Sequence, residues 1–263
     1  MSIFAARLFT AQKQQTKEHK KMMDYQEFNY GNTTVQRERD LERSAAMPVL
    51  MRKVYTWMTL ALLITAATAY GVANSPALLS MIYSSKITFF GLIIAEVALV
   101  WYISARINSL SLTTATTLFV LYSAINGATL ASIFIIYSMT AITKTFLVTA
   151  GTFGVMALYG YATKRDLSKI GSLAFMALIG LIIASVVNIF VASSTLDLIV
   201  SYAGVLIFVG LTAWDAQKIK LMLMEAPDAG EAAQKIALMG ALSLYLDFIN
   251  LFLYLLRIFG RRD

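Results

Sequence analysis

Apolar residues dominate the chain in seven long runs that short polar stretches separate. A helix needs about 20 apolar residues to cross a bilayer, and each run has roughly this length. The runs therefore predict seven membrane-spanning helices. Because the connecting stretches are short, neighbouring helices should be antiparallel and form one bundle. The expected spans are residues 54–73, 87–105, 113–137, 141–162, 173–192, 198–214 and 236–259.

The segment before the first apolar run has a different composition. Residues 1–50 are rich in Lys, Arg, Gln and Glu and lack a long apolar run, which is typical of a disordered segment or a surface helix. A cleaved secretion signal would need an apolar core, and this segment has none. The sequence therefore predicts a polar, basic, cytoplasmic tail over residues 1–50 and a membrane domain over residues 51–263.

Composition excludes several classes of protein and site. With 58% hydrophobic and 14% charged residues, the chain is too apolar for a soluble domain, in which about a quarter of residues are charged. It has no Cys, and its single His is His19 in the tail. We therefore expect no thiolate or histidine metal centre and no Ser-His-Asp triad. Basic loops beside anionic lipid headgroups explain the net charge of +7 without a nucleic-acid partner.

Lys and Arg are distributed unevenly between the two ends of the predicted bundle. Seventeen of them fall on the side of the N-terminus and five on the other side. Cytoplasmic loops carry an excess of basic residues, so we expect the N-terminus to be cytoplasmic. Arg261 and Arg262 conflict with this orientation if the last run spans the bilayer. A re-entrant or partly inserted last helix with a cytoplasmic C-terminus would remove the conflict.

The last apolar run carries a carboxylate at its centre. Residues 242–259 read LSLYLDFINLFLYLLRIF, with Asp247 in the middle. A carboxylate at the bilayer centre costs roughly 2.5 to 3.5 kcal/mol, so we expect Asp247 to face the inside of the bundle and to have a partner or a function. Small and polar residues recur around it at spacings of three and four, which places them on one side of a helix. The residues on this side are Gly240, Ser243, Asp247, Asn250, Tyr254 and Arg257.

A second carboxylate, Asp215, stands at the end of the sixth run. Pro227 and Gly230 predict a turn about midway between Asp215 and Asp247. In an antiparallel hairpin with this turn, the two carboxylates lie at the same depth and can approach each other. Two carboxylates in one site do not both ionise readily, so we expect the pair to hold one proton near neutral pH. When both are ionised, they offer the oxygen ligands that Ca²⁺ prefers.

Other polar residues of the spans are candidates for the same function. Arg106 ends the second span on the side of Asp215 and is predicted to form an ion pair with it, as a latch that protonation of Asp215 would weaken. Glu96, about 15 Å deeper on the same helix, is predicted with Asn250 to line a path across the membrane. Alternatively, Arg106 and Asp215 are interfacial side chains near helix ends, and Asn250, like Asn126, is a hydrogen-bonding contact between helices.

Three sequence blocks resemble a known family. They are ALSLYLDFINLFLYLLRIFG at residues 241–260, WDAQKIK at Asp215 and IIAEVALV at Glu96. Together they resemble the transmembrane Bax inhibitor motif family, specifically its bacterial YccA-like and YetJ-like branch, over about residues 49–260. The resemblance implies six helices around a central last helix, a place in the bacterial inner membrane and a pH-sensitive Ca²⁺ leak. It also implies that Asp215 and Asp247 are the pH sensor and that Arg106 bridges to one of them, although Arg106 lies outside any basic cluster here.

The sequence therefore predicts a pH-sensitive calcium leak channel, with Ca²⁺ and protons as its ligands and no required cofactor. The alternative is a non-conducting regulator that docks on other membrane proteins, such as a membrane protease, with the basic tail as a contact. Two Asp residues on consecutive helices are also the arrangement of intramembrane aspartyl proteases. Those enzymes need a Gly-x-Gly-Asp-like approach to the second Asp, whereas residues 243–247 read SLYLD. We therefore expect no enzymatic activity.

Overall fold

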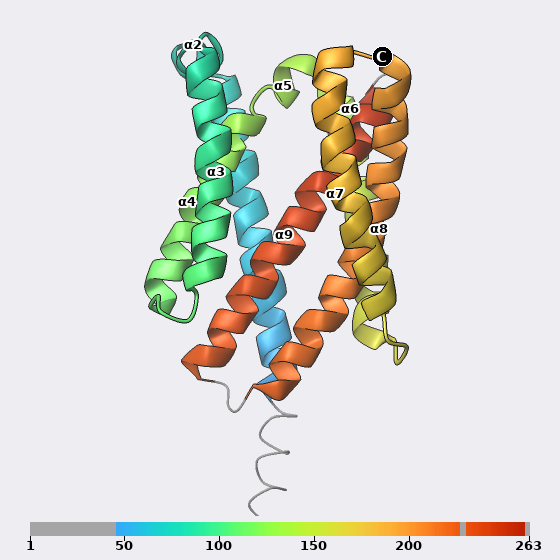
Figure 1. Cartoon of the computed structure of the whole chain (residues 1–263). Helices are drawn as coiled ribbons and strands as arrows, with labels where there is room; N and C mark the ends of the chain where they lie inside the picture. The colour runs from blue at the N-terminus through green and yellow to red at the C-terminus, as the bar shows by residue number, and fades with distance from the viewer. Residues whose placement is uncertain (1–45, 227–229, 261–263) are drawn as a thin grey trace, which may run out of the picture. The chain divides into compact units, whose positions relative to one another are not determined.

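The computed structural model describes residues 46–226 and 230–260, and all regular secondary structure in these residues is helical (Figure 1). Within this part of the chain, seven helices are long and apolar enough to cross a bilayer, so the predicted all-α, seven-helix fold is confirmed. The first is Ala46–Ala73. The others are α3 (Lys86–Arg106), α4 (Leu112–Leu130) with the short α5 (Ile133–Ile136), α6 (Met139–Ala162), α7 (Ser168–Val191), α8 (Ser194–Glu225) and α9 (Glu231–Phe259).

Serine residues cap the start of five described helices. In each, the serine Oγ accepts a hydrogen bond from the backbone N–H three residues later, at 3.1 to 3.5 Å. The cap satisfies one of the N–H groups that the first turn of a helix leaves without a partner. These caps explain why the helices begin where the short polar loops end. The capping residues are Ser75, Ser85, Ser111, Ser138 and Ser193.

Some boundaries differ from the prediction. The sixth span was expected to end at residue 214, but α8 continues to Glu225, so Asp215 lies inside a helix. Ala216, Ile219 and Leu223 are buried at spacings of three and four, which keeps this polar stretch helical against the bundle. A short helix that the sequence did not predict, α2 (Pro76–Tyr83), precedes α3. The described part of the first helix starts at residue 46, and the predicted disorder of the tail falls on residues 1–45, outside the described residues.

Helix α9 is the most buried of the seven spans. In its apolar 18-residue stretch, 67% of the residues are buried inside the protein. It crosses the bundle obliquely and contacts α8, α6 and α4 (Figure 1). Helices α3 and α4 lie on one side of it, and α7 and α8 on the other. The predicted central position of the last helix is therefore confirmed. Helix α9 is one continuous helix from Glu231 to Phe259, and the side of the membrane on which its C-terminal end lies stays a prediction.

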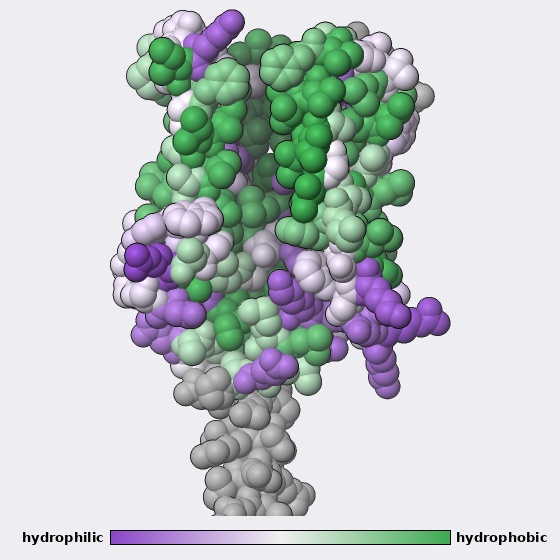
Figure 2. Space-filling view, viewed as in Figure 1, coloured by the Kyte–Doolittle hydropathy of each residue, from purple (hydrophilic) through white to green (hydrophobic). Residues whose placement is uncertain are grey.

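The outward faces of the helices are apolar. Figure 2 shows hydrophobic side chains over most of the height of the bundle, with hydrophilic residues gathered toward the lower end of this view. Large side chains are among the most exposed: Ile87 is 86% exposed, Trp101 72% and Phe190 83%. Apolar surface of this extent requires lipid around it. The protein is thus an integral membrane protein.

Candidate functional site

The polar side of α9 faces α8. A Cβ added at Gly240 of α9 would lie 2.9 Å from the side chain of Ile219, and one added at Gly204 of α8 would lie 2.6 Å from the ring of Tyr254. The absence of side chains at these two glycines lets the helices approach closely along their length. The two contacts also define the antiparallel register of the pair, since each joins one residue of α8 to one of α9.

This register brings the two predicted sensor residues together. Asp215 falls opposite Leu244, and Asp247 lies three residues further along α9, an offset of about one helical turn. The register therefore places the two carboxyl groups on facing helices, within about one helical turn of each other. Asp215 is half-buried, whereas Asp247 is only 5% exposed. Its Oδ2 atom makes no hydrogen bond with any described residue.

The chemistry of this pair follows from its burial. A buried carboxylate with an unpaired oxygen is costly while ionised, so the site favours either a bound proton or a cation. Ca²⁺ takes six to eight oxygen ligands, whereas two carboxylates supply at most four. Within the described part of the chain, no cluster of three or more His, Cys, Asp or Glu side chains could hold a metal ion. The pair can therefore contact a partly hydrated Ca²⁺, but it does not form a complete binding cage.

Arg106 does not reach the aspartate pair in this conformation. Its side chain is exposed at the end of α3, and it forms no ion pair with a described residue. The main contacts of α3 are with α4 and α2, whereas Asp215 lies on α8, on the other side of α9 (Figure 1). The sequence placed Arg106 at the correct end of the bundle but could not show which helices are neighbours there.

Glu96 belongs to a polar network that connects four helices. Asn126 Nδ2 donates to Glu96 Oε2 at 3.0 Å, and the Tyr245 hydroxyl donates to Asn126 Oδ1 at 2.9 Å. Thr65 Oγ1 of the first helix lies 2.7 Å from the Tyr245 hydroxyl and 2.9 Å from the carbonyl oxygen of Ser123. The two hydroxyl groups have only two protons for three short contacts, so only two of the contacts can be hydrogen bonds at one time.

Sequence reasoning missed the role of Tyr245 and Thr65. Tyr245 is fully buried, and the rings of Phe119 and Tyr122 pack edge-on against it. Its polar partners come from helices that are distant in sequence, so no local pattern indicated them. The prediction that Asn126 forms hydrogen bonds between helices is confirmed.

Asn250 was predicted either to line a path or to join two helices. Its Nδ2 instead donates to the carbonyl oxygen of Leu246 at 2.8 Å, one turn earlier in α9. The side chain is half-buried. This amide nitrogen is therefore engaged within its own helix, as polar side chains in membrane helices often are.

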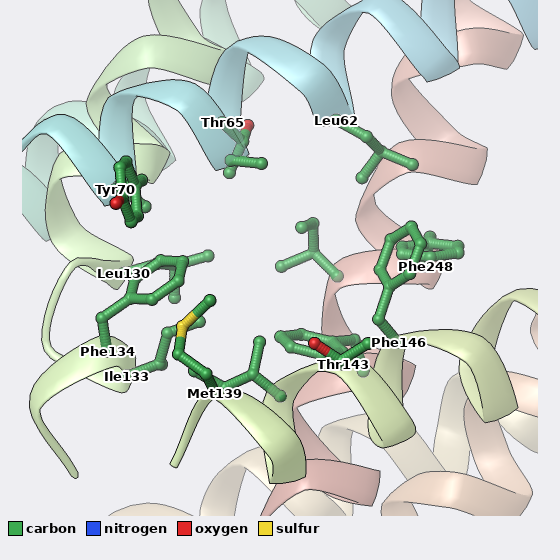
Figure 3. A pocket seen from close by; sticks show the side chains of 15 residues that line it. Leu62, Thr65, Tyr70, Leu130, Ile133, Phe134, Met139, Thr143, Phe146 and Phe248 are labelled. Carbon is green, nitrogen blue, oxygen red and sulfur yellow. The ribbon is translucent and has the colours of Figure 1, made fainter. Parts of the chain in front are cut away.

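An apolar cavity lies between the first helix and α9. Its volume is about 390 Å³, and it is bounded by the first helix, the α4–α5 segment, α6 and α9 (Figure 3). Phe248, which follows Asp247 in α9, is part of its wall. Among the lining residues, side-chain hydroxyl groups come from Thr65, Tyr70 and Thr143 alone. So few polar groups cannot replace the hydration shell of a cation, and we do not assign an ion path to this cavity.

The membrane domain matches known proteins. The profile of a family described as inhibitor of apoptosis-promoting Bax1 matches residues 47–263. The chain belongs to this Bax inhibitor-1 family. It is 52% identical over 220 residues to inner membrane protein YbhL of Escherichia coli strain K12, covering 83% of this chain and 94% of YbhL. It is also 47% identical over 212 residues to an uncharacterized protein of Borreliella burgdorferi, covering 81% and 91% of the two chains.

The match to the Bax inhibitor-1 family confirms the resemblance that the blocks around Glu96, Asp215 and Asp247 indicated. The matched region begins at residue 47, one residue after the start of the first described helix. The shared part of the family therefore coincides with the membrane domain and leaves out residues 1–46.

Proposed function

We propose that this member of the Bax inhibitor-1 family is a pH-sensitive calcium leak channel of the bacterial inner membrane, with a cytoplasmic N-terminus and no enzymatic activity. The observation that supports this most strongly is Asp247. It is a buried carboxyl on the central helix, with one oxygen that lacks a hydrogen-bond partner among the described residues. A second carboxyl, Asp215, lies about one helical turn away on the facing helix.

In this proposal, the protonation of the pair controls the force between α8 and α9. When Asp215 and Asp247 share a proton, they carry one negative charge and the helices remain in contact. When that proton leaves, two negative charges face each other in a region of low dielectric, and their repulsion is strong. Separation of the helices, or entry of a divalent cation, relieves the repulsion. Proton loss is thereby coupled to the passage of Ca²⁺, and the two carboxyls titrate as one unit.

The proposed latch acts in a closed conformation that differs from this structure. There, α3 would approach α8 so that the Arg106 guanidinium could bridge to Asp215 while the pair carries one negative charge. Protonation of Asp215 by a second proton would weaken this bridge, so the closed state holds only while the pair shares one proton. Glu96 is proposed to line the path, because its half-buried carboxylate is on α3, the helix that would move. Asn250, on the α8-facing side of α9, is proposed to line the same path.

Flux of Ca²⁺ into proteoliposomes that contain only the purified full-length protein tests the proposal. We expect flux above that of empty vesicles, a clear dependence on pH, and a flattened pH profile in Asp215→Asn. A protein without flux at any pH would contradict the proposal and support the non-conducting regulator that docks on other membrane proteins.

Asp166→Asn is the matched control for the loss of a carboxylate. Asp166 is exposed in the loop between α6 and α7, and hydrogen bonds from the side chain and backbone of Ser168 hold its pKa below the usual value. It therefore stays ionised over the pH range of the assay, and its loss should leave the pH profile unchanged. A flattened profile in this control would show that the effect of Asp215→Asn is a general effect of surface charge.

A further inference from the structure

A groove with two basic side chains lies at the end of the bundle where the first helix begins. We call it the basic groove. Its volume is about 560 Å³, and it opens between the first helix, the start of α4 and the start of α9. Six of its residues recur on one side of the first helix, which gives the groove its direction along the helix axis. The lining residues are Val49, Arg52, Lys53, Thr56, Trp57, Leu60, Leu112 and Gln234.

The positive charge of the basic groove is not neutralised by described residues. Lys53 Nζ donates to Gln234 Oε1 at 3.1 Å, and Gln234 is a neutral partner. Arg52 is exposed and forms no ion pair within the described ranges. The carboxylate at the edge of the groove, Glu231, already accepts from the backbone N–H of Leu112 at 3.3 Å and pairs with a lysine of its own helix at 3.1 Å. The groove therefore presents two positive charges without a matching anion among the residues that the structure describes.

The order of side chains along the groove matches the order of groups in a phospholipid. Arg52 and Lys53 follow Val49 by one turn, and the Thr56 hydroxyl and the half-buried Trp57 follow one turn later. Leu60, which is 43% exposed, lies about 10 Å from Lys53 along the axis. Tryptophan favours the headgroup level of a membrane, with basic residues on its aqueous side and apolar residues on the other.

We propose that the basic groove binds one phospholipid with an anionic headgroup. Its phosphate lies between Arg52 and Lys53, the glycerol region contacts Thr56 and Trp57, and an acyl chain follows Leu60 into the bilayer. The surrounding membrane supplies this ligand at high local concentration, and its charge complements that of the groove. The site is separate from the Asp215 and Asp247 pair and does not depend on the function proposed for that pair.

Native mass spectrometry of the full-length protein in detergent, titrated with phosphatidylglycerol or phosphatidylcholine, tests the site. Wild-type protein should retain one phosphatidylglycerol more tightly than phosphatidylcholine. Each basic residue contributes about fivefold to affinity for anionic lipid, so the double variant Arg52→Gln/Lys53→Gln should bind that lipid about 30-fold more weakly. Arg52→Gln alone, at an exposed position, should weaken binding about fivefold even if the double variant folds poorly.

Lys164→Gln/Arg165→Gln is the matched control. It removes one Lys and one Arg that are adjacent and exposed in the loop between α6 and α7, at the same end of the bundle, and it should retain wild-type binding. Three results would overturn the proposal. They are a loss of phosphatidylglycerol binding in this control equal to that in the double variant, equal retention of the two lipids by the wild type, and unchanged binding by Arg52→Gln. Displacement of the lipid by soluble glycerol 3-phosphate at matched concentration would also overturn it, because the groove would then be a site for a soluble phosphate.

Discussion

Removal of a single oxygen atom from the buried network should destabilise the bundle. Tyr245→Phe keeps the aromatic ring and its packing but removes the hydroxyl that lies 2.7 Å from Thr65 Oγ1 and 2.9 Å from Asn126 Oδ1. Thr65 can still donate to the carbonyl oxygen of Ser123, whereas Asn126 Oδ1 loses its bond to α9. The variant thus breaks the connection of α9 to both the first helix and α4 through this network.

The magnitude follows from the number of bonds lost. Hydrogen bonds between membrane helices contribute about 0.6 kcal/mol each on average and up to about 1.7 kcal/mol. The two hydroxyl protons of Thr65 and Tyr245 can form only two hydrogen bonds among the three contacts at one time. The variant therefore loses one or two hydrogen bonds. We therefore expect the free energy of unfolding to fall by about 1 to 3 kcal/mol.

Reversible unfolding in mixed detergent micelles, with SDS as the denaturant, measures this free energy. Tyr202→Phe is the control, because Tyr202 lies on α8 with 53% of its surface exposed, and it should change the free energy by less than about 0.5 kcal/mol. If Tyr245→Phe were as stable as the wild type, the network would not be holding these helices together.

Three other predictions test the packing, the latch and the orientation. A Cβ at Gly160 of α6 would collide with the Ala213 carbonyl oxygen of α8, whereas Gly154 on the same helix faces open space. Gly160→Ala should therefore lower the free energy of unfolding by about 1 to 3 kcal/mol, and Gly154→Ala should not. Equal effects of the two substitutions would contradict the observed packing. Arg106→Ala should increase Ca²⁺ flux into proteoliposomes at neutral pH, because the latch is proposed to hold the closed state; unchanged flux in a folded variant would remove Arg106 from the mechanism. A reporter at the N-terminus should be cytoplasmic, and an external signal would reverse the assignment of sides.

The fold was predictable because a bilayer imposes a length and an apolar composition on each span. The seven runs and the antiparallel order follow from these constraints alone. The end of α8 was not predictable in the same way, since the stretch after Trp214 is polar. It remains helical because Ala216, Ile219 and Leu223 pack against the bundle, a tertiary contact that a hydropathy pattern does not reveal.

The parts of the site differ in how far the sequence could predict them. Asp215 and Asp247 lie on helices joined by one turn, so their approach follows from simple antiparallel geometry. Arg106 was predicted to reach Asp215 on α8, but α3 contacts α4 and α2 instead. The polar partners of Tyr245 lie on the first helix and α4, which are distant from it in sequence. Hydrophobic patterns indicate which side chains face inward, but they do not indicate which helix lies next to which. The contacts of these two residues therefore required the structure.

The most direct test of the aspartate pair is the pH dependence of Ca²⁺ flux in Asp247→Asn, measured beside its thermal stability in detergent. Asparagine keeps the shape and an accepting oxygen but cannot titrate. The account predicts a stable protein whose flux no longer changes with pH. A well-folded Asp247→Asn protein with wild-type, pH-dependent flux would contradict the account.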